Sequence, residues 1–178
     1  MRTSIVTILI ISILWSCSLS TKKDHRKNIE QFNNKTNSEV AKTDIDSVEI
    51  PKFEIEIKLN ETAEKTIVDE KESIIVQAYF FGIPKDTTLK DYIDEGKIGI
   101  GSQRVELFET RVAKFDNLKI SKKDYEGLKD KNFEVLINVF TGRRTSQFNL
   151  INCDLLQDGI DTIKGRRWIL KGRLITEN

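Results

Sequence analysis

Few residues of this chain have side chains suited to covalent or metal chemistry. His25 is the only histidine, and Cys17 and Cys153 are the only cysteines. His25 lies in a polar segment that cannot hold it as a fixed general base, so serine–histidine and cysteine–histidine catalysis are not expected. A single histidine and the lack of a CxxC pair also argue against the usual zinc sites. We therefore predict a protein that is not an enzyme and that carries no cofactor.

Cys153 and a group of aspartates remain as candidates. Cys153 follows an apolar stretch and is predicted to be a small buried residue, with a reactive thiol as the alternative. The stretch "DLLQDGID" places Asp154, Asp158 and Asp161 around a glycine, but it lacks the alternating ligand positions of an EF-hand. Solvated aspartates in a turn are the favoured interpretation there, and a calcium site stays open.

Cys17 stands at the end of an apolar run. Arg2 supplies a positive start, and residues 5–15, "IVTILIISILW", are apolar except for hydroxyl side chains. This run is too short for a helix that spans the hydrocarbon core of a bilayer, which needs about 20 residues. The pattern is typical of the hydrophobic part of a secretory signal peptide.

The residues "LWSC" at 14–17 resemble the lipobox of bacterial lipoproteins, in which a leucine lies three residues before the cysteine and a small residue directly before it. The resemblance implies a signal peptide over residues 1–16 and cleavage before Cys17. It also implies acylation of Cys17, with palmitate among the fatty acids, and a membrane as the first partner. The expected location is the cell envelope, most simply the outer membrane on its periplasmic face or the cell surface. A cysteine at the end of a short transmembrane helix is the alternative.

Residues 17–50 are rich in Lys, Asn, Thr, Ser and Asp, and their apolar residues are too sparse for a core. Low hydrophobicity of this kind predicts a flexible polar tether that lifts a domain off the membrane. Basic residues near the anchor would be solvated beside anionic head groups, with a sorting signal as the alternative; they are Lys22, Lys23, Arg26 and Lys27.

From residue 51 to residue 178 the hydrophobic pattern has the two-residue period of strands. In "KFEIEIKLN", one face carries the apolar residues and the other carries charged residues; the apolar residues are Phe53, Ile55, Ile57 and Leu59. This part of the chain is therefore predicted to be an all-β domain, an antiparallel β-sandwich of about seven strands. The predicted strands cover residues 53–59, 73–82, 102–109, 111–120, 132–142, 148–156 and 166–175.

Two segments, 87–97 and 122–131, break the strand pattern and predict one or two short helical turns in loops. The stretch "AKFDNLKI" at 113–120, followed by "FEVLINVFTG" at 133–142, resembles the middle of transthyretin-like sandwiches. This resemblance implies the architecture of some small outer-membrane lipoproteins of bacterial secretion machines. It implies no functional residue, and an immunoglobulin-like strand order is equally compatible with the pattern.

The longest connection between predicted strands is a candidate surface for a partner. It covers residues 83–101 and carries Tyr92, and tyrosine often anchors protein interfaces. The alternative is that Leu89, Tyr92 and Ile93 cap the end of the core.

Two arginine pairs form the other candidate surface. Arg143 and Arg144, like Arg166 and Arg167, follow a glycine at the edge of a predicted strand, and both pairs are expected at one end of the sandwich. Solvated charge is the favoured interpretation. The alternative is contact with an anionic surface, such as an acidic patch of a partner or lipopolysaccharide.

These observations predict a non-catalytic, membrane-anchored lipoprotein that acts as a binding or assembly module for a protein partner in the envelope. The alternative is a periplasmic inhibitor or immunity lipoprotein that blocks a toxin or a lysin. A nucleic-acid partner is not expected, because 29 basic residues against 28 acidic residues give a net charge of only +1.

Overall fold

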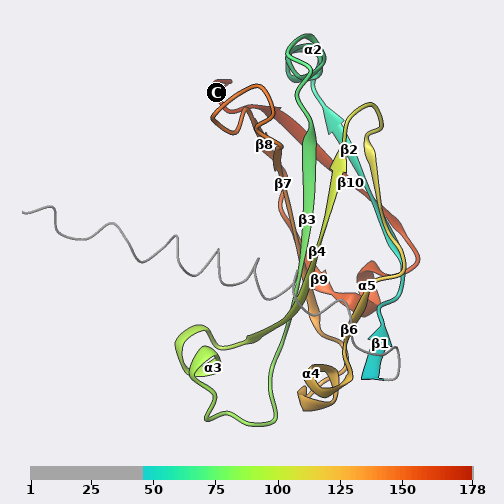
Figure 1. Cartoon of the computed structure of the whole chain (residues 1–178), viewed down its shortest axis with the longest axis vertical. Helices are drawn as coiled ribbons and strands as arrows, with labels where there is room; N and C mark the ends of the chain where they lie inside the picture. Colours follow the sequence, from blue (N-terminus) through green and yellow to red (C-terminus); the bar gives the residue numbers. More distant parts are fainter. Residues whose placement is uncertain (1–45, 178) are drawn as a thin grey trace, which may run out of the picture. The chain divides into compact units, whose positions relative to one another are not determined.

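The computed structural model describes residues 46–177 (Figure 1). The signal peptide, Cys17, His25 and the tether up to residue 45 lie outside these residues, so the predictions for them stay predictions. The described part of the chain forms two four-stranded sheets and one two-stranded sheet, with four helices in the connections.

The first sheet has the order β5-β2-β10-β8 and the second has the order β4-β3-β7-β9, while β1 pairs with β6. In the first sheet the strands are β5 (Val112–Phe115), β2 (Phe53–Leu59), β10 (Arg167–Leu174) and β8 (Ile151–Cys153). In the second they are β4 (Ile98–Leu107), β3 (Ile74–Gly82), β7 (Glu134–Thr141) and β9 (Leu156–Gly159). The small sheet consists of β1 (Ser47–Glu49) and β6 (Lys119–Ser121).

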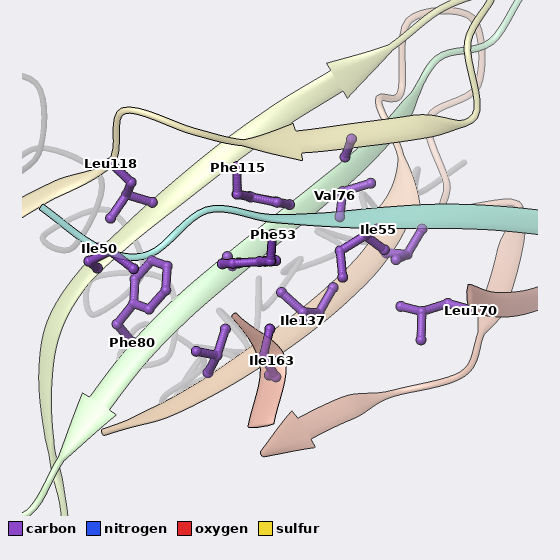
Figure 2. Close-up of a cluster of buried hydrophobic side chains, with 14 of the residues drawn as sticks. Ile50, Phe53, Ile55, Val76, Phe80, Phe115, Leu118, Ile137, Ile163 and Leu170 are labelled. Carbon is purple, nitrogen blue, oxygen red and sulfur yellow. The ribbon is translucent and has the colours of Figure 1, made fainter. Parts of the chain in front are cut away.

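The core lies between the two four-stranded sheets, as Figure 2 shows. Alternate residues of β2 and β3 point into it, and the rings of Phe53 and Phe115 stack with centroids 4.8 Å apart. Each large apolar side chain that is fully buried contributes about 1.5–3 kcal/mol relative to exposure. The prediction of an all-β sandwich from the two-residue period is therefore confirmed.

β4 begins at Ile98, inside the predicted 83–101 connection, and two of the predicted strands are each divided in the structure. The predicted strand 111–120 is divided into β5 and β6, because Asn117 adopts a left-handed backbone with φ 58°. The predicted strand 148–156 also divides, since β8 pairs with β10 while β9 crosses to the other sheet and pairs with β7.

One pairing departs from the expected antiparallel arrangement. β2 and β10 run parallel, with Glu54 opposite Arg167 and Leu59 opposite Gly172, whereas the other paired strands in the described residues are antiparallel. The first sheet is therefore mixed, and its two central strands come from opposite ends of the domain sequence.

Two helices lie within the predicted helical segments, and two were not predicted. The predicted pair is α3 (Lys90–Glu95) and α4 (Lys122–Gly127); the other pair is α2 (Glu61–Asp69) and α5 (Ile160–Ile163). α2 begins where the Asn60 side chain accepts a hydrogen bond from the backbone of Ala63 at 2.9 Å. Ala63 and Ile67, one turn apart, bury the inner face of α2.

The folded part begins before residue 51. β1 pairs with β6, and Ile50 is buried and donates its backbone N–H to the Leu118 carbonyl at 2.8 Å. Residues 47–50, assigned above to the tether, therefore belong to the domain, because Val48 and Ile50 supply apolar side chains to it.

The connections gather at two ends of the sandwich (Figure 1). The α2 end comprises α2, Glu72 and Ser73 before β3, the 108–111 turn between β4 and β5, and the 142–150 loop between β7 and β8. The α3 end comprises the 83–97 connection with α3, together with α4, α5 and β1. Several exposed apolar side chains lie at these two ends.

Candidate binding surfaces

A buried carboxylate organises the α2 end. Glu72 is only 2% exposed, and its Oε1 accepts hydrogen bonds from the backbone N–H groups of Ser73 and Arg144, both at 2.9 Å. Its Oε2 accepts from the backbone of Thr145 at 2.9 Å and of Ser146 at 3.1 Å, and from the Thr145 hydroxyl at 3.0 Å. Burial by itself raises the pKa of a carboxyl, but these hydrogen bonds lower the pKa of Glu72 to about 2.

A second carboxylate lies beside the first. The Arg144 guanidinium donates to both oxygens of Glu106, from Nε at 2.8 Å and from Nη2 at 2.7 Å, and the Ser73 hydroxyl donates to Glu106 Oε1 at 2.6 Å. The hydrogen bonds from Arg144 and Ser73 lower the pKa of Glu106 to about 2. The loop approaches so closely that a Cβ on Gly142 would lie 1.9 Å from Ser73 Oγ, so this position requires glycine.

These contacts fix a loop that presents an aromatic ring to solvent. Residues 144–146 are held by the contacts described above. Beyond them, the backbone N–H of Phe148 donates to the Ser146 hydroxyl at 3.1 Å, and the Thr141 hydroxyl donates to the Phe148 carbonyl at 3.4 Å. The Phe148 side chain is nevertheless 75% exposed. The loop is thus held through its polar groups, while its largest apolar side chain is left free.

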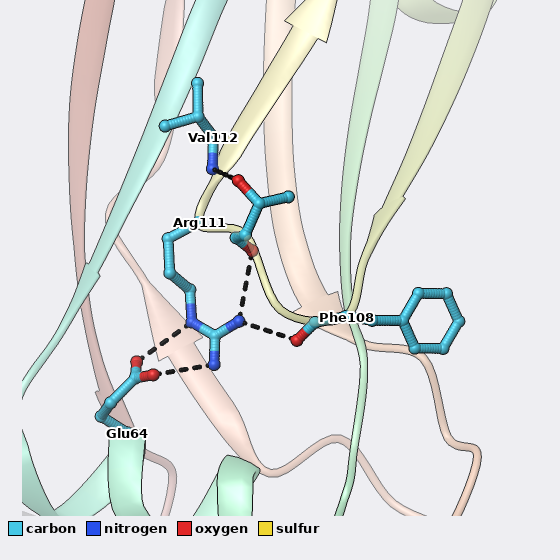
Figure 3. A network of polar contacts seen from close by, with 5 residues as sticks. Glu64, Phe108, Arg111 and Val112 are labelled. Atoms are coloured by element: carbon cyan, nitrogen blue, oxygen red, sulfur yellow. Dashed lines mark hydrogen bonds and ion pairs between the residues drawn. The ribbon is translucent and has the colours of Figure 1, made fainter.

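The neighbouring 108–111 turn repeats this arrangement (Figure 3). The Arg111 guanidinium donates to both oxygens of Glu64 on α2, at 2.8 and 3.1 Å. The same guanidinium donates to the carbonyls of Phe108 at 3.1 Å and Thr110 at 3.2 Å. The Phe108 ring points away from this network and is 59% exposed.

The α2 end therefore presents two phenylalanine rings on turns that are fixed by ion pairs and hydrogen bonds. The exposed apolar residues Val68 on α2 and Ile175 after β10 lie at the same end. Aromatic side chains on fixed elements are typical anchors of protein interfaces, because little conformational entropy is lost when a partner covers them.

Sequence reasoning missed both rings because it placed them inside strands. The sequence does indicate that Leu107 and Phe108 cannot both face the core, because adjacent residues in a strand point to opposite faces. Leu107 is buried, so Phe108 has to leave the core.

The α3 end has a different character. The 83–97 connection projects from the sandwich, and none of the residues of α3 is buried (Figure 1). Leu89 is 41% exposed and Ile93 is 68% exposed, so these two side chains do not cap the core. Tyr92 is half-buried.

The structure separates the two arginine pairs. Arg143 and Arg144 lie at the α2 end, whereas Arg166 and Arg167 lie at the start of β10, at the opposite end. The expectation that both pairs share one end is wrong. One pair follows the end of β7 and the other lies at the start of β10, and β7 and β10 both end at the α2 end. Arg144 is engaged with Glu106, and Arg167 forms ion pairs with Glu54 at 2.7 Å and with Glu56 at 3.7 Å. Arg143 and Arg166 are exposed.

Cys153 is half-buried at the end of β8. Burial, and then the charge of Asp154, raise the pKa of its thiol to about 11, so the reactive thiolate is scarce near neutral pH. Its Sγ would lie 2.4 Å from a Cβ on Gly172, which shows that the sulfur packs against the β10 backbone.

The three aspartates suggested for calcium have separate partners. Asp154 accepts from the backbone of Lys171 at 3.1 Å, Asp158 accepts from the backbone of Gly159 at 2.7 Å, and Asp161 pairs with Lys164. Within residues 46–177 no group of three or more His, Cys, Asp or Glu side chains is arranged to hold a metal ion.

Comparison with known proteins gives no match to a family model, to a curated protein or to a solved structure. None of the helices in the described residues has the length and apolar character needed to cross a bilayer.

Proposed function

We propose that this protein is a non-catalytic lipoprotein of the cell envelope, anchored through Cys17, that binds a protein partner through the α2 end of its β-sandwich. The anchor rests on the apolar run and the "LWSC" stretch of the sequence. The binding role rests on one structural observation, which is the presentation of Phe108 and Phe148 on fixed turns.

Fixed turns support binding for an energetic reason. Exposed aromatic side chains gain free energy when a partner removes them from water, and this gain is reduced when the loop has to become ordered at the same time. Here Glu64, Glu72 and Glu106 hold the two turns before any partner arrives. The α2 end is thus preorganised for contact through its rings.

The ionisable groups of this end support binding more than catalysis. The low pKa values of Glu72 and Glu106 keep both carboxylates charged as hydrogen-bond acceptors, which is the opposite of what a general acid near neutral pH requires. The high pKa of Cys153 likewise suits a packed side chain better than a nucleophile.

A pull-down from detergent-solubilised envelopes, with the full lipidated chain as bait, tests the binding role. We expect a protein that is recovered by the wild type and lost, by about tenfold or more, with the double variant Phe108→Ala, Phe148→Ala. Ile169→Ala is the matched control, because Ile169 is an exposed apolar residue of β10 away from the α2 end. Equal recovery by the wild type and the double variant would contradict the assignment of the α2 end.

Metabolic labelling with an acyl probe tests the anchor. We expect the wild type and Cys153→Ala to carry the label, and Cys17→Ala to lack it and to accumulate as an uncleaved or unanchored chain. Label that persists on Cys17→Ala would exclude this cysteine as the lipidation site.

A further inference from the structure

We propose that the partner protein contributes an extended segment, which pairs with the free edge of β4 and adds a strand to the β4-β3-β7-β9 sheet. This inference rests on the proposed function, because it describes how the partner of the α2 end is held. The free edge, defined here as residues 102–106, leads directly into the 108–111 turn that carries Phe108. The paired segment and the exposed ring would therefore belong to one continuous surface.

The direction of the backbone groups of β4 follows from the pairing of β3 with its two neighbours. The N–H and the carbonyl of a strand residue point to the same neighbour in an antiparallel sheet, and successive residues alternate between neighbours. The Gly142 N–H donates to the Ser73 carbonyl at 2.8 Å, so Ser73 faces the β7 side. Three residues later Val76 faces β4, where its partner is Val105. Val105 therefore directs its backbone groups toward β3.

Alternate residues of β4 direct their backbone groups away from the sheet. Ser102, Arg104 and Glu106 alternate with the residues that bond to β3, so their N–H and carbonyl groups point to the open side. Within residues 46–177 β4 pairs with β3 alone, and no other backbone hydrogen bond involves these three residues. Arg104 is exposed, and the other two are half-buried. A row of free donors and acceptors of this kind is complementary to an extended peptide backbone.

The other edges of the two four-stranded sheets are better protected in the described part of the chain. β8 has three residues, and β5 and β9 have four each, whereas β4 has ten. β5 also carries the exposed Lys114 and is followed by the left-handed Asn117. A register shift opposite Phe80 and Phe81 distorts the first part of β4. Short strands, lysines and bulges block edge pairing, and residues 102–106 have none of these features.

The two charged side chains beside the free edge extend over the sheet and leave the edge uncovered. The guanidinium carbon of Arg104 lies 5.7 Å from the centroid of the Phe140 ring on β7, so this side chain reaches across β3. Glu106 is held by Arg144 from the loop that follows β7. An incoming strand therefore has neither charge to displace.

The edge selects its occupant by backbone chemistry. Lipid head groups, glycans and nucleic acids lack the regular alternation of N–H and carbonyl groups that an extended peptide offers, so the occupant is a protein segment. The direct passage from residues 102–106 to Phe108 assigns this segment to the protein that the α2 end binds.

Amide hydrogen exchange of the full-length chain in detergent micelles tests whether the edge is free and what fills it. In the chain alone we expect the amides of Ser102, Arg104 and Glu106 to exchange at least about tenfold faster than those of Gln103 and Val105, which bond to β3. Addition of the partner recovered in the pull-down should protect the three fast amides. Protection of all five amides in the chain alone, or no added protection in the complex, would overturn the proposal.

A benzophenone amino acid at position 104 of the full-length chain, in intact cells, identifies the occupant. We expect an adduct with the same protein that the pull-down recovers. An adduct between two copies of this chain, an adduct within the chain, an adduct with lipid, or no adduct would each overturn the proposal.

Arg104→Pro and Arg104→Ala form a matched pair, because both remove the side chain and only proline removes the N–H that points to the open side. We expect Arg104→Pro to lower recovery of the partner about tenfold and Arg104→Ala to retain it. Melting temperatures show whether both chains fold, and if Arg104→Pro does not, the exchange experiment decides. Equal recovery by the two variants would contradict pairing through the backbone.

The variant Phe108→Ala, Phe148→Ala separates this proposal from the proposed function. A partner that is lost by this variant and retained by Arg104→Pro refutes the paired segment alone. A partner that is retained by this variant, and that still forms the adduct at position 104, refutes the role of the two rings and leaves the edge as the binding site.

Discussion

At the α2 end, Glu72 and Glu106 are engaged by backbone and arginine donors, whereas at the α3 end Asp91, Asp94 and Glu95 stay exposed on a six-residue helix. A carboxylate thus fixes the backbone at one end of the sandwich and lies in solvent at the other. Carboxylates that are buried with donors fix the backbone around them, while exposed carboxylates determine which partners are attracted or repelled. The comparison indicates that carboxylates fix the backbone of the α2 end, whereas the three acidic residues of α3 lie in solvent.

The largest expected difference between the ends comes from removing a carboxylate. Glu72→Ala would leave the backbone N–H groups of Ser73, Arg144 and Ser146 without their buried acceptor, so we expect a loss of about 3–5 kcal/mol in the free energy of unfolding. Urea unfolding measures this loss. Asp94→Ala is the matched control and should leave the unfolding midpoint unchanged. A midpoint for Glu72→Ala equal to that of the control would show that the carboxylate does not hold the loop.

The second largest effect is expected from acid, which should lower the free energy of unfolding through the α2 end. Folding lowers the pKa of Glu72 from 4.5 to about 2, so the charged carboxylate contributes fully above pH 4.5 and loses its contribution as the pH falls toward 2. A shift of this size corresponds to about 3 kcal/mol. Unfolding measured across this pH range should show that stability falls less steeply in Glu72→Gln than in the wild type. Parallel curves for the two chains would contradict this source of acid sensitivity.

A smaller effect is expected at the 108–111 turn. Arg111→Ala removes the bidentate contact with Glu64 and two hydrogen bonds to turn carbonyls, and we expect a loss of about 1–2 kcal/mol. Lys58→Ala is the control, because Lys58 and Glu56 form an exposed ion pair at 3.6 Å that should contribute almost nothing. Thermal unfolding distinguishes the two variants. Equal melting temperatures would show that the turn does not depend on the arginine.

The sandwich was predictable from the sequence because alternation depends on neighbouring residues. Phe53, Ile55 and Ile57 point to one face whatever the rest of the chain does, and they are buried as predicted. α2 was missed because few of its nine residues are apolar, and only Ala63 and Ile67 are buried.

The binding surfaces were less predictable because they depend on residues that are distant in the sequence. Glu72 accepts a hydrogen bond from Arg144, 72 positions later, and the local sequence around either residue does not predict this contact. The placement of the arginine pairs failed for the same reason, since it depends on the direction of β10 relative to β7. Tyr92 was correctly placed on a short helix, and its role at an interface stays a prediction.

The parallel pairing of β2 with β10 determines when the domain can fold. Glu54 and Arg167 lie side by side although 113 positions separate them, so β2 gains its central place in the sheet only after the last described strand is available. Contacts between such distant residues close late and slow folding. A chain that crosses a membrane N-terminus first would keep the apolar face of β2 uncovered until almost all of it had emerged. Truncation before β10 would therefore leave an aggregation-prone chain in place of a shortened domain.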